Sequence, residues 1–188
     1  MLEIKKTTVN TGIPIWQKRP ETLQGGFTVD DAGFVAGDTI PGGTPIYVDE
    51  QTRKATIARV AVLTEAATNV ATQLKVKKGS LIKVGASVKA KTAGAQAITA
   101  IDKTNAYYDL VTVGTTLGIA LAIGDALFVD NAAYTNPKGL TYEDVTIGSN
   151  GITSVSCAVR GTVYARRIVP VPQTVRALLP LIYFSESY

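Results

Sequence analysis

From Phe27 onward, apolar and polar residues alternate with a period of two along most of the sequence, and glycine-containing turns interrupt this alternation. Successive side chains of a β-strand point to opposite faces of a sheet, so the period predicts strands that each bury one face. The turns recur at intervals of about 8 to 12 residues, which is typical of all-β barrels and sandwiches. We therefore predict an all-β fold.

Two segments show this pattern of alternation and turns clearly. In residues 44–57, the run TPIYV is followed by the polar turn DEQTRK and then by ATI, which predicts two strands around a turn. In residues 97–113, Asp102, Lys103, Thr104 and Asn105 are predicted to form a hairpin turn between two strands. Both segments predict antiparallel hairpins.

Helices are expected to be rare. Residues 61–73 are rich in alanine but also in threonine and valine, so we predict strand, loop and strand there. Residues 172–179 begin with a proline suited to a first helical turn and end at Pro180, so one short C-terminal helix is expected.

The first 24 residues differ from the rest because they are polar and contain Gly12, Pro14 and Pro20. Prolines interrupt a hydrogen-bonded ladder, so we predict an extended N-terminal arm over 1–24 that contains a short strand. Residues 25–188 are predicted to form a single all-β domain.

The arm carries the chain's single tryptophan within the apolar phrase Ile13, Pro14, Ile15 and Trp16. Trp16 could cover the core of its own domain, or it could anchor the arm on a neighbouring protein, since tryptophan is enriched in binding hot spots. These four residues are our candidate contacts with a neighbouring protein or with another subunit.

Histidine is absent, which removes the usual general base at neutral pH and the commonest metal ligand. The adjacent acids Asp30–Asp31, Asp49–Glu50 and Glu143–Asp144 lie beside turns, and neighbours on a strand point to opposite faces. The single cysteine, Cys157, lies in an apolar alternation and is predicted to be a buried, unreactive thiol. We expect no catalytic residue, cofactor or metal.

Neither a membrane nor a nucleic acid is an expected partner. Charges occupy Glu3, Lys5 and Lys6, where a signal peptide needs apolar residues, and no run approaches the ~20 apolar residues that span a bilayer. This predicts a soluble protein made in a cytoplasm. The net charge is +4, and its densest basic run, residues 75–78, is typical of a solvated strand face.

One phrase occurs three times: GTPIYVD from Gly43, GASVKAK from Gly85 and GDALFVD from Gly124. Each is a glycine turn followed by a strand whose apolar residues are two positions apart. Their irregular spacing does not fit a propeller or solenoid, but it suits a small barrel of long, bent hairpins.

The same phrases carry a resemblance to a family. Residues 35–55 (VAGDTIPGGTPIYVDEQTRKA), 117–130 (LGIALAIGDALFVD) and 160–172 (RGTVYARRIVPVP) resemble head decoration proteins of tailed bacteriophages, particularly the larger head fibre proteins. The resemblance implies a β-clip-like or small β-barrel domain that assembles as a homotrimer on the outer capsid surface of the virion. It also implies that the arm adds β-structure to the major capsid protein.

Two other functions stay open on the residues alone. A carbohydrate-binding or adhesin module, with a host surface glycan as partner, could use the tyrosines at 107, 108, 134 and 142 as a stacking platform. An enzyme with a cofactor on Lys83 or Lys89 is disfavoured because the matching hairpin-tip motifs are missing.

The C-terminal segment 171–188 is unusually apolar for a tail. We expect it to pack in the core or at a subunit interface. The apolar residues that require this cover are Val175, Leu178, Leu179, Leu181, Ile182, Tyr183 and Phe184.

Overall fold

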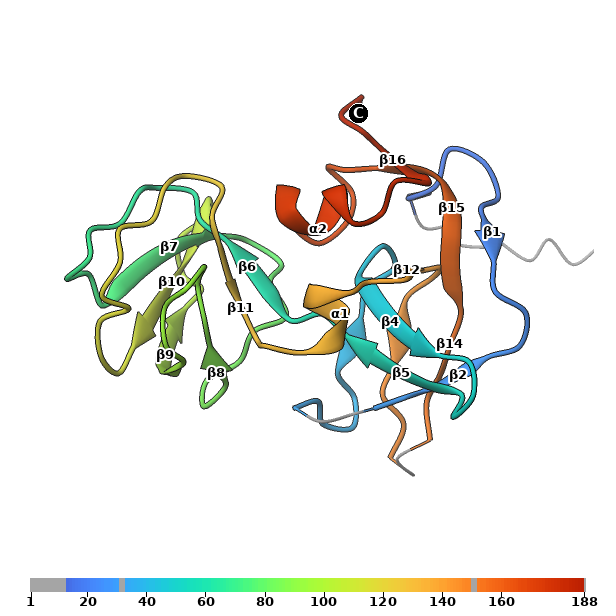
Figure 1. The fold of residues 1–188 in the computed structure, drawn as a ribbon, viewed down its shortest axis with the longest axis horizontal. Coiled ribbons are helices and arrows are strands. Elements are labelled where there is room, and N and C mark those ends of the chain that lie inside the picture. The colour runs from blue at the N-terminus through green and yellow to red at the C-terminus, as the bar shows by residue number, and fades with distance from the viewer. Residues whose placement is uncertain (1–12, 31–32, 150–151, 188) are drawn as a thin grey trace, which may run out of the picture.

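The computed structural model describes residues 13–30, 33–149 and 152–187 (Figure 1). The chain is mostly β, with 39% strand against 5% helix and a curled half-barrel sheet, which confirms the predicted all-β fold. Residues 1–12 of the predicted arm and Asp31 of the Asp30–Asp31 pair lie outside the described residues.

The described residues form two lobes, each with its own buried cluster (Figure 1). The inserted lobe comprises residues 60–129 and contains the cluster around Leu63, Val76 and Leu127. The main lobe comprises the described residues before 60 and after 129, and its clusters centre on Ile46 and Leu140. The chain therefore leaves the main lobe once, builds the inserted lobe and returns.

The main lobe is built on an eight-stranded sheet. Its strand order is β1 (Glu21–Thr22), β15 (Cys157–Tyr164), β12 (Gly139–Thr141), β4 (Pro45–Asp49), β5 (Lys54–Ile57), β2 (Phe27–Val29) and β14 (Ser154–Val155), with β16 (Ile182–Ser185) pairing in parallel with β15. A separate pair joins β3 (Thr39–Ile40) to β13 (Val145–Thr146). β15 is eight residues long and pairs with β1, β12 and β16, so it holds the described part of the arm and the C-terminal strand in one sheet.

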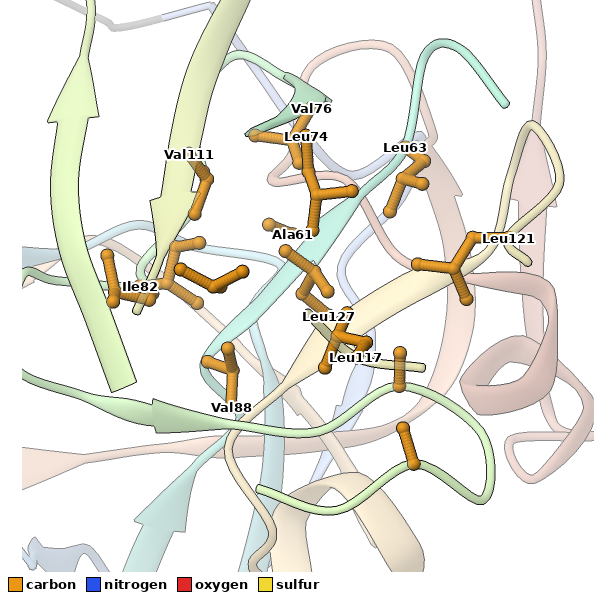
Figure 2. Packing of buried hydrophobic residues seen from close by; sticks show 14 residues of the cluster. Ala61, Leu63, Leu74, Val76, Ile82, Val88, Val111, Leu117, Leu121 and Leu127 are labelled. Atoms are coloured by element: carbon orange, nitrogen blue, oxygen red, sulfur yellow. The ribbon is translucent and has the colours of Figure 1, made fainter. Parts of the chain in front are cut away.

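The inserted lobe contains a four-stranded sheet and a two-stranded sheet that enclose one core (Figure 2). The strands are β7 (Gln73–Lys77), β10 (Tyr108–Val113), β9 (Gln96–Asp102) and β8 (Ser87–Val88) in the first, and β11 (Ala126–Phe128) and β6 (Val60–Val62) in the second. Leu74 and Val76 of β7 are buried and Lys77 is exposed, as the alternation predicts.

Both predicted hairpins are confirmed. β4 pairs antiparallel with β5, and the side chain of Asp49 accepts hydrogen bonds from the backbone N–H of Gln51 at 2.9 Å and of Thr52 at 3.2 Å. β9 pairs antiparallel with β10 across the turn that follows Asp102. Strand, loop and strand over 61–73 are also confirmed, since β6 and β7 lie at its two ends.

The repeated phrase gives a positive-φ glycine followed by a strand at all three places. Gly43, Gly85 and Gly124 have φ of 81°, 84° and 88° and precede β4, β8 and β11. The second and third copies lie side by side in the inserted lobe, because Lys89 and Phe128 exchange backbone hydrogen bonds of 2.8 and 2.9 Å.

Two short helices occur in the described part of the chain. α2 (Gln173–Ala177) follows Pro172 and ends before Pro180, which confirms the predicted C-terminal helix. α1 (Ala132–Thr135) was not predicted; the Asn131 side chain caps it by accepting a hydrogen bond from the backbone N–H of Tyr134 at 3.2 Å. None of the described helices is long and apolar enough to cross a membrane.

The apolar C-terminal segment divides between core and surface. Val175, Leu179 and Ile182 are buried against Leu140 and Val163 of the main lobe. Leu178, Leu181 and Tyr183 are 49%, 61% and 70% exposed. The predicted packing in the core is confirmed for the first set, and we call the second, exposed set the C-terminal face.

Candidate partner-binding surface

The described part of the arm runs along β15 of its own chain. The N–H of Gln17 donates to the carbonyl of Thr162 at 3.0 Å, and the N–H of Tyr164 donates to the carbonyl of Ile15 at 2.8 Å. Further along, β1 continues the antiparallel pairing with β15. Residues 15–22 therefore add a strand-like edge to their own sheet.

Trp16 fastens this edge. Its indole Nε1–H donates a hydrogen bond of 2.8 Å to the carbonyl of Tyr142, and its half-buried ring packs against the cluster that contains Val163. Burying an aromatic ring while satisfying its one polar group is the favourable arrangement for tryptophan. These contacts correspond to the interpretation in which Trp16 covers the core of its own chain.

A groove of about 820 Å³ lies beside the arm. We call it the arm groove, and its lining comes from residues 13–20, 41–42 and 142–144 and from Arg167. All four candidate residues, Ile13 to Trp16, line it. The structure thus places all four predicted residues along one groove.

The four candidates differ in what they offer to a partner. Ile13 is 77% exposed and Pro14 is exposed, whereas Ile15 and Trp16 are half-buried. Ile13 and Pro14 therefore present apolar surface at the groove, and the other two hold the arm in place.

The opposite wall of the arm groove depends on Gly42. Its N–H donates to Asp144 Oδ1 at 2.7 Å, and a Cβ added there would lie 2.6 Å from Ile15 Cδ1 and 3.2 Å from the backbone of Glu143. A larger residue at this position would push the Ile15 side chain and crowd the backbone of Glu143, so glycine suits the close approach of the arm. Gly42 and Asp144 were not predicted as parts of the site, because they are 102 residues apart in the sequence.

Arg167 was also missed. Its Nη1 donates to the carbonyl of Pro14 at 2.9 Å, and its guanidinium carbon lies 4.2 Å from the centre of the Tyr164 ring. The stacking of the guanidinium on the Tyr164 ring fixes the position of Arg167, and its hydrogen bond to Pro14 holds the arm. No local signal could pair residues that stand 153 positions apart.

The environment of Cys157 is that of a structural cysteine. Cys157 is fully buried, and burial raises the pKa of its thiol to about 12. The thiol is therefore protonated at neutral pH, and the predicted buried, unreactive cysteine is confirmed. Within the described residues, no group of three or more His, Cys, Asp or Glu side chains is placed to hold a metal ion.

The tyrosines considered as a glycan platform have separate surroundings. Tyr107 is 87% exposed, whereas the ring of Tyr108 is covered by Lys75, whose Nζ lies 5.2 Å from the ring centre. Tyr134 stacks on Phe128 with ring centroids 3.7 Å apart, and Tyr142 lines the arm groove.

No family model, curated protein or solved structure matches this chain. The resemblance to phage head decoration proteins therefore stays a prediction from its phrases alone.

Proposed function

We propose that this chain is a structural virion protein. In this proposal it binds the outer surface of a tailed-phage head as a homotrimer and decorates or cements the capsid there, with the major capsid protein as its partner. The exposed apolar residues Ile13 and Pro14 at the arm groove are the observation that carries the proposal.

The arm groove has the features of a protein-binding surface. Ile13 and Pro14 expose apolar area beside a hollow, and exposed apolar surface next to polar walls is typical of interaction sites. The polar groups around it, Trp16 Nε1, Asp144 and Arg167, already hydrogen-bond to the chain's own backbone. Such groups shape a surface and stabilise it, which suits binding better than bond-making.

The C-terminal face supports self-association. Leu181 and Tyr183 are largely exposed on the segment that leads into β16 and along it. Among the described strands, β16 pairs only with β15, so no described strand pairs with its other edge. Open strand edges and apolar faces are commonly covered by symmetric assembly.

The proposal is tested by sedimenting the protein with purified heads of the phage that encodes it. We expect the protein to co-sediment with the heads. Replacing Ile13 by Asp should weaken binding about tenfold or more, because the new carboxylate would be buried without a partner at an apolar contact.

Val70→Asp is the matched control. Val70 is 71% exposed in the inserted lobe, so the same charge enters away from the arm groove, and binding should stay unchanged. Failure of the unaltered protein to sediment with heads would refute the proposal. Equal losses for the two variants would refute the role of the arm groove.

A further inference from the structure

The lysines of the inserted lobe are nearly all paired. Between residues 75 and 91 the sequence has six lysines, and among the described residues five of them contact a carboxylate. The pairs are Lys75–Glu65, Lys78–Asp109, Lys83–Asp38, Lys89–Asp130 and Lys91–Asp125. Lys77 is the sixth, and no described carboxylate pairs with it.

Lys77 lines a second pocket, of about 400 Å³, which we call the cationic pocket. Lys78, Arg166 and Arg176 line it too, and Glu186 is the one acid among its described lining residues. Lys77 and Lys78 belong to the inserted lobe, whereas the arginines belong to the main lobe. Figure 1 shows α2, which carries Arg176, on the side of the main lobe nearest the inserted lobe.

The carboxylate of Glu186 already lies among these positive charges. Glu186 Oε1 accepts a hydrogen bond of 2.8 Å from Arg176 Nη1, and that bond lowers the pKa of Glu186. The charges of Arg166 and Lys77 lower the pKa of the same group further, although neither forms an ion pair with it. Three cations from two lobes therefore act on one carboxylate position.

Arg176 is held ready for this role. Its Nε donates to the carbonyl of Val171 at 3.1 Å, and its guanidinium carbon lies 4.9 Å from the centre of the Phe184 ring. A guanidinium fixed in this way loses little freedom when it binds a carboxylate. Arg166 and Lys77 are exposed and are not paired with any described acid, so they are available to a second anion.

We infer that the cationic pocket binds an acidic segment of a partner protein, with Glu186 as an internal competitor. The inference goes beyond the proposed function, because it concerns another surface and does not need the arm groove. A peptide carboxylate fits better than a phosphate for two reasons. The wall formed by Val62, Ile168 and Pro170 can contact the stem of a side chain, and the described lining has no glycine to form a backbone phosphate cradle.

The test measures binding of a fluorescent hexaglutamate peptide by polarisation, at low and at physiological salt. Binding should weaken as salt rises, because exposed charges are screened. Lys77→Ala and Arg166→Ala should each weaken it about fivefold, the size expected for one partly exposed charge pair.

Two control variants and one gain-of-binding variant sharpen the result. Lys54→Ala and Arg160→Ala remove equal charges from exposed positions on β5 and β15, and should leave the affinity within about twofold. Glu186→Gln should tighten binding about threefold, since it removes the competing carboxylate and keeps the shape.

Inorganic pyrophosphate is the second ligand of the test. The inference is wrong if hexaglutamate does not bind, if the control variants lose as much affinity as Lys77→Ala, or if pyrophosphate binds while the peptide does not. Weaker binding by Glu186→Gln would contradict the role of Glu186 as a competitor.

Discussion

At the scale of single residues, Asp109 is a buried carboxylate in the inserted lobe that needs a cationic partner. It is 2% exposed, and its carboxylate contacts Lys78 Nζ at 2.8 Å. The same ammonium donates to the carbonyl of Lys103 at 2.8 Å, so it also ties down the turn between β9 and β10. A buried carboxylate without its cation is costly, so the fold depends on this pair.

Replacing Lys78 by Met keeps the stem and removes the charge. We expect the free energy of unfolding to fall by about 2 kcal/mol, below the usual cost of breaking a fully buried pair because Lys78 is partly exposed. Urea denaturation measures the change.

Lys75→Met is the control for this substitution. Lys75 is as exposed as Lys78, but its partner Glu65 is 62% exposed where Asp109 is buried, so the loss should be below about 1 kcal/mol. Equal losses in the two variants would show that burial of Asp109 does not set the cost.

The sequence predicted a solvated strand face over residues 75–78, but it could not predict the partners of its lysines. The alternation of Leu74, Lys75 and Val76 gives the buried and exposed faces of β7 directly. Lys78 and Asp109 are 31 residues apart, and their contact exists only because β7 pairs with β10. Partner choice therefore follows from strand order, which the alternation does not encode.

At the scale of elements, the arm behaves as a strand added to β15. Its hold depends on the hydrogen bonds of residues 15 and 17, on Trp16 and on Arg167. Trp16 contributes both a packed ring and a donor, so its removal should release the arm from the sheet.

Limited trypsin digestion tests this hold at Lys18, which is exposed on the arm. Trp16→Ala should raise the cleavage rate at Lys18 about tenfold, since cleavage requires local opening. Trp16→Phe keeps a ring but loses the Nε1 donor, and it should give an intermediate rate. Mass spectrometry of the fragments follows the cleavage, and identical rates for all three proteins would show that Trp16 does not fasten the arm.

Turns, strands and helices were predictable where a local sequence pattern determines them. The Asp49 turn, the three glycine-led strands and the helix between Pro172 and Pro180 all have such a pattern, and all are present. α1 escaped prediction because it has four residues, too few for helical periodicity to show. Of the residues that line the arm groove, the sequence indicated only Ile13 to Trp16, because Gly42 and Arg167 reach it through long-range contacts.

At the scale of the whole molecule, the two lobes are joined by more than the chain. Lys83 of the inserted lobe hydrogen-bonds to Asp38 of the main lobe, and Phe128 stacks on Tyr134 across the boundary. Our prediction of one domain over 25–188 rested on uniform alternation, and that alternation is the same in both lobes. A boundary near residues 60 and 129 has no composition change to mark it.

We propose that this molecule works by assembly, with copies of itself covering the C-terminal face and the edge of β16 that no described strand pairs with. Light scattering coupled to size-exclusion chromatography tests this most directly by giving the molar mass in solution. The account predicts three times the 19.8 kDa of one chain, and Tyr183→Asp should lower that mass by charging the interface. A mass of 19.8 kDa that does not change with protein concentration would contradict it.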